Sequence, residues 1–292
     1  MSAPSVSVII PTLNAASEID DLLTKLDNQC LKPHEIMVID SSSDDDTVSI
    51  ARKHMSTRVE VINRKDFNHG LTRHLALLKS TGDYVLFMTQ DAVPANDHLI
   101  ENIVKPMLSD PKVCQVTGRQ IPKADAREYE RLVRLRNYPS ESFIRVPSDL
   151  KTIGIKAVHS SDVCCCYRRT GYLEVGGFKK TDMSEDMLLS LALFKAGYSI
   201  AYAGDAEVYH SHNFTPIQQY RRNKAVGSFL KEHNAELEGI SEVGEGISLV
   251  KDVSAKLISE KRLLEFLSFG IDCAARLVGN RVGKIRIHKT KL

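Results

Sequence analysis

Residues 82 to 92 read Gly-Asp-Tyr-Val-Leu-Phe-Met-Thr-Gln-Asp-Ala, an apolar run that stops abruptly at the carboxylate of Asp91. A strand that is buried on both faces of an α/β sheet carries a continuous apolar run rather than an alternating one. Ligands of such sheets bind just beyond the carboxyl ends of the strands. The stretch therefore predicts a buried strand over 85–88, and it puts Asp91 where the cation of a bound phosphate compound would lie.

The segments around this strand alternate between two patterns. Short apolar or β-branched runs predict strands at residues 6–11, 35–39, 59–62, 113–118, 163–167, 199–203 and 206–210. Apolar residues at helical spacing predict helices at 15–29, 47–54, 72–80, 97–108, 127–136 and 185–196, and a final helix over 253–278 in a mostly helical stretch from residue 216. Strands that alternate with helices imply βαβ units, so the predicted fold class is α/β.

The composition is that of an ordinary globular protein, with 292 residues, 42% of them hydrophobic and 26% charged. The net charge of +2 does not suggest a nucleic acid partner. The six cysteines include the run 164–166 and form no CxxC pair, which favours reduced thiols in the cytosol over disulfides or a zinc site. We find no signal peptide and no apolar stretch of the ~18–20 residues of a membrane span. We therefore expect a cytoplasmic protein, and peripheral binding at the inner face of the cell membrane stays open.

Polar side chains also follow the first and second predicted strands. Asp40 ends the second strand, and Pro11-Thr12-Leu13-Asn14 closes the first. Because the carboxyl ends of parallel strands meet at one edge of a sheet, Asp40 and Asp91 can bracket one ligand, and Thr12 and Asn14 can hydrogen-bond its base or ribose. One alternative stays open, since Asp and Ser favour turns and Asp40 could instead cap the serine run at 41–43.

Asp91 suits a hard cation. Mg²⁺ or Mn²⁺ takes carboxylate oxygens together with substrate phosphates and water. His210 and His212 occupy alternate positions of a late strand, so they point to one face and could add an imidazole ligand. Position alone favours His210, and a packing role is the alternative for either histidine.

Two acids, Glu185 and Asp186, open a predicted helix after a polar turn. A carboxylate here could accept the proton of a substrate hydroxyl as a general base. A structural alternative is equally complete, because acids in a first turn offset the helix dipole and Ser184 is placed to cap the helix.

Arg73 lies at the start of another predicted helix, in the stretch Asn68-His69-Gly70-Leu71-Thr72-Arg73. Thr72 would cap that helix, and the guanidinium of Arg73 could donate two bonds to phosphate oxygens. A solvated arginine at the surface is the alternative.

In this order, these residues resemble the family 2 inverting glycosyltransferases of GT-A fold, over about residues 5 to 230. The matching stretches are the opening strand and its loop (6–14), the nucleoside-binding turn (38–47), Thr89-Gln90-Asp91 in the place of the DxD motif, Gly176-Gly177-Phe178 followed by Glu185-Asp186, and His210. The resemblance implies a Rossmann-like, mostly parallel mixed sheet flanked by helices.

The resemblance also implies a role for each matching residue. It assigns nucleotide-sugar binding to Pro11, Thr12, Asn14, Asp40, Ser42, Arg73, Gln90 and Asp91, the metal to Asp91 and His210, acceptor contacts to Gly177, Phe178 and Glu185, and the catalytic base to Asp186. The first acid of the DxD motif is replaced by Thr89, and the turn has Ser41 where the family often has a second acid. The ion must therefore rely on Asp91, a histidine and the diphosphate.

These departures, with His210-Ser211-His212 and Tyr220-Arg221-Arg222, resemble the bacterial rhamnosyltransferase branch of the family. That branch implies dTDP-L-rhamnose as donor and a saccharide on a lipid diphosphate as acceptor, in the synthesis of O-antigen or another surface polysaccharide. A UDP-sugar donor and a non-catalytic nucleotide-sugar binding module remain alternatives. A dinucleotide-dependent oxidoreductase is disfavoured, because no GxGxxG follows the first strand.

The resemblance divides the chain into a glycosyltransferase domain over 1–230 and a helical extension over 231–292. The extension ends in a basic tail, since Arg276 to Leu292 contains six basic residues and no acidic one. An apolar face of Leu257, Leu264, Leu267, Ile271 and Leu277 could bind an anionic membrane surface through residues 253–292. Packing against the catalytic domain, or against a second copy in a homo-oligomer, is the alternative.

Overall fold

The computed structural model describes residues 3–181, 183–237 and 245–285. The chain forms two compact units: Met1–Ile121 with Tyr138–His210, and Pro122–Asn137 with Ser211–Leu292. The division at residue 230 stays a prediction, because compactness does not test where an independently folding domain would end. Part of the basic tail, residues 286–292, lies outside the described residues.

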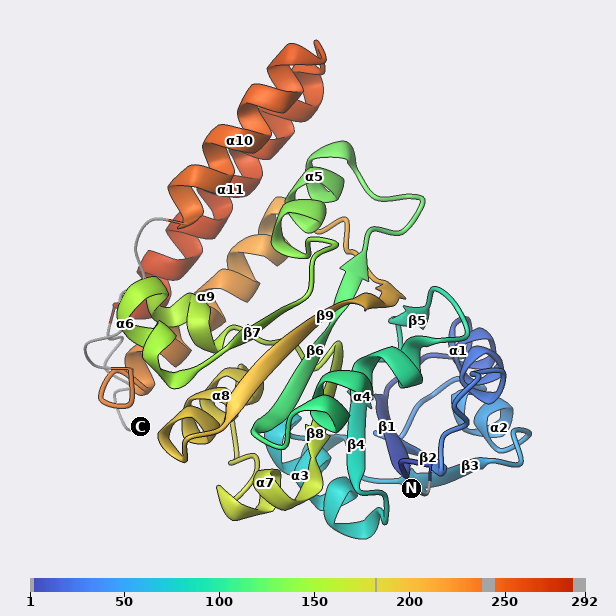
Figure 1. Ribbon diagram of the computed structural model, residues 1–292. Coiled ribbons are helices and arrows are strands. Elements are labelled where there is room, and N and C mark those ends of the chain that lie inside the picture. The colour runs from blue at the N-terminus through green and yellow to red at the C-terminus, as the bar shows by residue number, and fades with distance from the viewer. Residues whose placement is uncertain (1–2, 182, 238–244, 286–292) are drawn as a thin grey trace, which may run out of the picture. The chain divides into compact units, whose positions relative to one another are not determined.

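The first unit is built around a nine-stranded mixed sheet (Figure 1). Its strands are β1 (Val6–Thr12), β2 (Glu35–Asp40), β3 (Thr57–Val61), β4 (Tyr84–Met88), β5 (Val93–Pro94), β6 (Val113–Ile121), β7 (Phe143–Arg145), β8 (Cys164–Arg168) and β9 (Ser199–Tyr209). Their order is β3-β2-β1-β4-β8-β6-β9-β5, and β7 pairs with β9. The predicted α/β class and mixed sheet are confirmed.

The direction of the strands decides where the loops meet. Strands β3, β2, β1 and β4 run parallel, and Thr12 at the end of β1 pairs with Asp40 at the end of β2. Strand β8 is antiparallel to both of its neighbours, β4 and β6. The carboxyl ends of β1, β2 and β4 therefore share one edge, as predicted, and the amino end of β8 reaches the same edge.

The two strands predicted over 199–210 form one continuous strand, β9, so that prediction was wrong. Strand β9 pairs with β6, and the register shifts where Gly118 faces Ala203 and the next residue, Arg119, faces Glu207. The irregularity absorbs the intervening residues without ending the strand.

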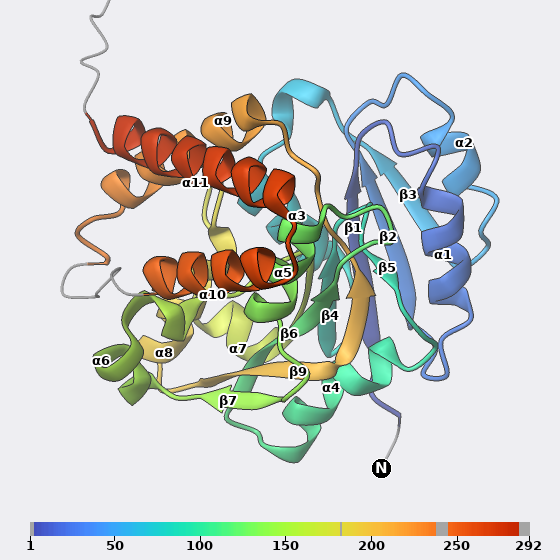
Figure 2. The same cartoon turned by 90° about the horizontal axis from the view of Figure 1, so that it is seen from above.

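Helices cover both faces of this sheet. They are α1 (Ile19–Asp27), α2 (Thr47–Ala51), α3 (His69–Lys79), α4 (Leu99–Ser109), α6 (Leu150–Ile153), α7 (Arg169–Glu174) and α8 (Glu185–Lys195), with short 3₁₀ turns at Arg64–Asp66, Pro147–Asp149 and Gly154–Val158. Alternate strand residues such as Val8 and Leu86 pack against α1 and α4 in the main core. Figure 2 shows α1 and α2 on one side of the sheet and α3 on the other.

The opposite face carries an aromatic cluster. Phe87 of β4 lies 5.7 Å from Tyr167 of β8 and 5.5 Å from Phe178, measured between ring centroids. Tyr172 of α7 completes the group, 5.2 Å from Phe178. Such edge-to-face and tilted pairs add to the stability that burial alone provides.

The second unit is helical. It contains α5 (Glu128–Asn137), α9 (Pro216–Glu232), α10 (Glu245–Ser259) and α11 (Leu263–Lys284). Thr215 and Gln218 form a capping box at the start of α9, with a proline at the first helical position. Helix α11 packs closely on α9, since a Cβ at Gly279 would lie 2.4 Å from the Tyr220 carbonyl oxygen.

The single helix predicted over 253–278 was wrong. The chain turns between α10 and α11, and Lys261 adopts a φ of 59° there. Helices α10 and α11 lie side by side (Figures 1 and 2). Leu257 is fully buried with Tyr129, Val253 and Phe269, so it does not belong to an exposed apolar face. Among the described helices, none has both the length and the apolar character that crossing a bilayer requires.

Candidate functional site

Asp40 lies fully buried at the end of β2. The Thr12 hydroxyl donates to its Oδ2 at 3.0 Å, and the Ser43 hydroxyl donates to the same atom at 2.5 Å. The Ser43 main-chain N–H donates to Oδ1 at 2.9 Å. These bonds match the turn-capping alternative. A contact between Asp40 and a nucleotide stays a prediction.

The loop after β1 is fastened to the same turn. Asn14, whose φ is 52°, accepts the Asp44 N–H at 2.9 Å and donates its own N–H to the Ser43 hydroxyl at 2.8 Å. Ser42, with a φ of 57°, donates to the Ile62 carbonyl at 2.7 Å. The structure thus brings the predicted residues Thr12, Asn14, Asp40 and Ser42 together, next to Pro11, and it holds them through internal hydrogen bonds.

Gln90 joins the ends of β1 and β4. Its Oε1 accepts the Leu13 N–H at 2.8 Å, and its Nε2 donates to the Leu13 carbonyl at 3.2 Å. An amide suits this place because it offers both a donor and an acceptor.

Asp91 and His210 meet at the same edge. The Nε2 atom of His210 lies 3.3 Å from Oδ2 of Asp91. The other ring nitrogen, Nδ1, lies 2.9 Å from Oε1 of Gln120, whose Nε2 donates to Tyr138 and Ser161. With Gln120 placed to accept from Nδ1–H, Nε2 is the nitrogen that faces the carboxylate, and its lone pair is available to a cation whenever the ring is neutral.

This donor set fits a divalent cation. A carboxylate oxygen and an imidazole lone pair face each other, and the group that accepts from the far nitrogen fixes the tautomer, as around many metal-bound histidines. The nearby Thr89 Oγ1 is buried and makes no hydrogen bond within the described part of the chain. His212 belongs to the second unit, where its ring stacks on Phe214 at 4.7 Å between centroids.

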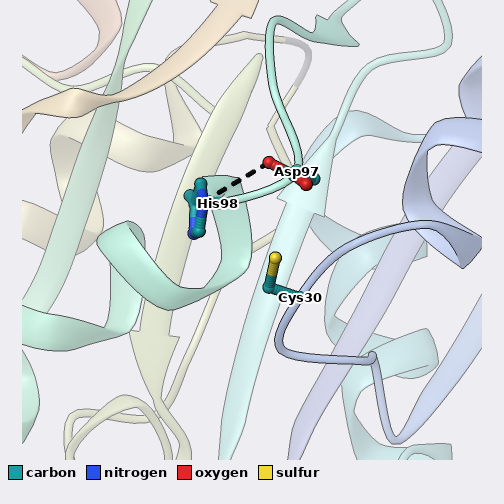
Figure 3. Close-up of side chains that lie close together, drawn as sticks. All are labelled: Cys30, Asp97 and His98. Carbon is teal, nitrogen blue, oxygen red and sulfur yellow. Dashed lines mark ion pairs between the residues drawn. The ribbon is translucent and has the colours of Figure 1, made fainter.

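A second group of potential metal ligands lies elsewhere in the first unit. Figure 3 shows Cys30, Asp97 and His98, which converge from two loops. All three are exposed, and the two nitrogens of His98 lie 3.4 Å from Asp97 and 3.0 Å from Glu101. Such exposed ion pairs are ordinary surface features, so we assign no ligand to them.

Asp186 lies half-buried in the first turn of α8. Its Oδ1 accepts the Met187 N–H at 2.7 Å, and its Oδ2 accepts the Asp162 N–H at 3.3 Å. Removal from water, and then the negative charge of Glu185, raise the pKa of Asp186 to about 7. A carboxylate with such a pKa is suited to accept a proton near neutral pH.

The predicted caps of the two helices around this site were wrong. Ser184 makes no capping bond and adopts a φ of 56°. Asn68 rather than Thr72 caps α3, where its Oδ1 accepts the Leu71 N–H at 3.0 Å. The two acids do lie in the first turn of α8, as predicted.

Arg73 of α3 is buried rather than solvated. Its NH1 lies 3.0 Å from Oε1 of Glu185, which is also buried. The structure therefore brings Arg73 to the acceptor-side residue Glu185, and a contact with the diphosphate stays a prediction. Gly177 and Phe178 lie close by. Gly177 has a φ of 63°, and a Cβ there would lie 2.5 Å from Nδ1 of His74, whereas Phe178 is buried in the aromatic cluster.

Two residues that the sequence did not single out connect these groups. Gln120 bonds both His210 and the Ser161 hydroxyl, and Asp162 follows Ser161 and donates its N–H to Asp186. The next residue, Val163, accepts the Thr89 N–H at 3.2 Å. The segment 161–163 thus links the Asp91–His210 pair to Asp186. An acid directly before a predicted strand was the available signal for Asp162, whereas Gln120 had none.

Comparison with known proteins agrees with this geometry. Glycosyl transferase family 2 matches residues 7–176, more than half of the chain. The chain therefore belongs to glycosyl transferase family 2, and the predicted enzyme class is confirmed.

Two relatives indicate the branch of the family. The chain is 39% identical over 226 residues to the O-antigen chain rhamnosyltransferase RfbN of Salmonella typhimurium, covering 77% of this chain and 72% of that protein. It is 38% identical to the O-antigen chain rhamnosyltransferase WbaN of Salmonella anatum, with the same coverage. The resemblance to the rhamnosyltransferase branch is thereby confirmed.

Solved structures share the fold at low sequence identity. The mannosyltransferase PcManGT from Pyrobaculum calidifontis, in complex with GDP-Man and Mn²⁺, superimposes with a TM-score of 0.66 at 17% identity, covering 97% of this chain and 89% of that one. Glucosyl-3-phosphoglycerate synthase from Mycobacterium tuberculosis, in complex with Mn²⁺ and UDP, gives a TM-score of 0.55 at 18% identity and 82% coverage of each chain. The predicted fold is confirmed.

Proposed function

We propose that the protein transfers L-rhamnose from dTDP-L-rhamnose, with inversion, to a lipid-diphosphate-linked saccharide in the synthesis of a bacterial surface polysaccharide such as O-antigen. The two Salmonella relatives are the support for L-rhamnose as the transferred sugar, since both are named O-antigen chain rhamnosyltransferases. The geometry supports the proposed reaction. Segment 161–163 connects the Asp91–His210 pair, which would bind the cation, to the half-buried carboxylate of Asp186, which would act as the base.

Asp91 and His210 would hold Mg²⁺ or Mn²⁺, and Gln120 would orient the imidazole. Such an ion neutralises the charge that grows on a departing diphosphate. Thr12, Asn14, Asp40, Ser42 and Gln90 shape the edge that would receive the nucleotide.

Asp186 would act on the acceptor. Its carboxylate takes the proton of the acceptor hydroxyl while that oxygen bonds to the anomeric carbon and the bond from this carbon to the diphosphate oxygen breaks. One displacement inverts the configuration. The main-chain N–H groups of Met187 and Asp162 fix both carboxylate oxygens during this step.

Donor choice can be tested on the purified protein. Binding of dTDP-L-rhamnose, UDP-glucose and GDP-mannose is measured with and without Mn²⁺, and release of dTDP is measured on addition of a polyprenyl-diphosphate-linked saccharide. We expect metal-dependent binding of the dTDP-sugar and dTDP release that needs the acceptor. Preference for UDP-glucose would overturn the donor, and binding without any release would favour the non-catalytic module. Asp91→Asn is the matched control and should lose the metal dependence of binding.

The second unit offers a surface for the lipid-linked acceptor. Helix α11 exposes an apolar stripe over about 140° of its circumference at 100° per residue, formed by Leu263, Leu264, Leu267, Ile271, Leu277 and Val278. Arg262, directly before the helix, is also exposed, at 50%, and Lys256 of α10 is exposed at 56%. Apolar stripes flanked by cations bind anionic lipid interfaces, so the proposal puts the protein at the inner face of the cell membrane.

Vesicle flotation tests this surface. The wild type should float with vesicles that contain phosphatidylglycerol, and Leu264→Gln/Leu267→Gln should not. Leu108→Gln/Leu173→Gln, which alters exposed leucines of the first unit, is the control and should float. Equal flotation of all three would remove the lipid contact, and concentration-dependent dimerisation lost only in the α11 variant would assign the stripe to a second copy.

A further inference from the structure

The region around Asp186 contains an unusual concentration of buried charge. Arg73 of α3, Asp162 before β8 and Glu185 of α8 are all nine-tenths or more buried. With Asp186 included, the group holds three carboxyl groups and one guanidinium, and full ionisation would leave a net charge of −2. Three further ionisable groups adjoin it. The Tyr167 hydroxyl of β8 donates to Oδ1 of Asp162 at 2.8 Å, the buried Cys165 thiol of β8 lies near Asp162, and Nδ1 of His69 lies 3.4 Å from NH1 of Arg73.

The hydrogen bonding of this group is incomplete. Nε of Arg73 and Oδ2 of Asp162 lie 3.9 Å apart, too far for a hydrogen bond. Both atoms are buried, and neither finds a partner within the described part of the chain. By contrast, NH1 of Arg73 bonds Glu185 at 3.0 Å and the His69 carbonyl at 3.1 Å. Arg73 is therefore committed to Glu185 and only faces Asp162.

Charge at these positions acts on Asp186. Burial and the charge of Glu185 raise its pKa, and the charge of Arg73 acts in the opposite direction. Burial and the charge of Asp186 likewise raise the pKa of Asp162. Removing the one cation would leave Glu185 uncompensated beside the base.

We propose that Arg73 is a positioning residue for the catalytic base: it neutralises Glu185 and faces Asp162, and it thereby keeps Asp186 in its proton-accepting form near neutral pH. This role rests on the proposed function of Asp186 as the base. It replaces the contact with the donor diphosphate that the sequence suggested for Arg73, because the whole residue is only 4% exposed.

The acid limb of kcat/KM for the acceptor against pH tests the inference, since it reports the base of the enzyme before that substrate binds. Glu185→Gln removes a like charge and should move the limb to lower pH by about one unit. Arg73→Gln should move it to higher pH by about one unit, for the opposite reason. Arg73→Gln/Glu185→Gln removes both charges and should return the limb toward the wild-type position.

The two roles of Arg73 predict different kinetic constants. A positioning residue leaves the KM for dTDP-L-rhamnose within about twofold in the double variant, whereas a residue that binds the diphosphate raises it about tenfold or more. An acid limb that stays at the wild-type position in Glu185→Gln, or that the double variant leaves where Glu185→Gln put it, would overturn the inference. Because these two variants remove an acid from a group in which acids outnumber the cation, they keep the test decisive even where Arg73→Gln does not fold.

Two further measurements separate this inference from the proposed function. Asp186→Asn with undiminished transfer would reject Asp186 as the base, whatever the other variants do. Titration of the Asp186 carboxyl by ¹³C NMR, read without any substrate, should show a lower pKa in Glu185→Gln, a higher pKa in Arg73→Gln and a return toward the wild-type value in the double variant. Arg168→Gln is the matched control, because Arg168 is a part-buried arginine that donates to the carbonyls of Met107 and Val113. It should cost stability without moving the acid limb.

Discussion

The two halves of the candidate site treat their carboxylates in opposite ways. At the nucleotide edge, Asp40 is fully buried, and Thr12 and Ser43 donate to both of its oxygens. At the base side, Asp162 has a buried oxygen that makes no hydrogen bond within the described residues, and Asp186 has a raised pKa. Satisfied buried groups rigidify a structure, whereas buried groups left under-bonded cost stability and are found where chemistry needs them.

The difference suggests a division of labour. The hydrogen bonds around Asp40 fix the shape of the nucleotide-binding edge. The buried charges around Asp186 cost stability, and catalysis would be the reason to keep them. The same replacement, Asp to Asn, should therefore have opposite consequences in the two regions, and four predictions test this contrast.

The largest effect is expected for the activity of Asp186→Asn. An amide cannot accept the proton of the acceptor hydroxyl, and general base catalysis contributes about 10²–10⁴-fold. We expect kcat to fall by that factor while the affinity for dTDP-L-rhamnose changes little. Single-turnover transfer and nucleotide binding are the two measurements. A loss of donor affinity of the same size would show instead that Asp186 belongs to the nucleotide region.

Asp40→Asn should come next, as a loss of stability. The amide NH₂ replaces an acceptor that faces two hydroxyl donors, and bonds to a buried charge become bonds to a neutral group. We expect the free energy of unfolding to fall by about 2 to 3 kcal/mol, measured by urea denaturation. An unchanged stability would indicate that the turn does not depend on these bonds and that Asp40 is reserved for a ligand.

The sequence predicted the nucleotide edge better than the region around Asp186. The acids that follow apolar strands were visible, because strand ends in a parallel sheet share an edge whatever the details of packing. The partner of Arg73 was not visible, since Glu185 lies 112 residues away in the chain. Gln120 and Asp162 gain meaning only through the antiparallel placement of β8 between β4 and β6.

Boundaries without local signals were also missed. The turn between α10 and α11 contains neither glycine nor proline, and Lys261 takes the positive φ that usually favours glycine. The apolar spacing continues across this turn, so periodicity alone predicted one helix. The buried face of Val253, Leu257 and Phe269 becomes recognisable only when the two helices pack with α5.

Asp186→Asn should raise stability at alkaline pH. The raised pKa means that the folded state holds the proton more tightly than the unfolded state, so wild-type stability falls as pH rises from about 4 to about 7 and stays reduced above that. The variant lacks this loss. We expect it to be more stable than the wild type by on the order of 1 to 2 kcal/mol at pH 8, after discounting for partial exposure and one lost hydrogen bond.

Urea denaturation of both proteins at pH 5 and pH 8 measures this gain. The difference between the two proteins should be smaller at pH 5, where the wild-type carboxyl is still protonated when folded. A variant that is less stable than the wild type at both pH values would mean that Asp186 is satisfied as fully as Asp40, and the contrast between the two regions would disappear.

Gln90→Glu should have the smallest effect and probes the nucleotide edge from its other side. The new carboxylate can still accept the Leu13 N–H, but it faces the Leu13 carbonyl where the amide donated. Because Gln90 is partly exposed, we expect a loss of about 1 kcal/mol, measured by urea denaturation with Gln90→Met as the control. The added acid also lies next to Asp91. If this edge tolerates charge as the base side does, Gln90→Glu will bind Mn²⁺ more tightly without losing stability. If the edge is built for shape, stability will fall and the affinity for the ion will not rise.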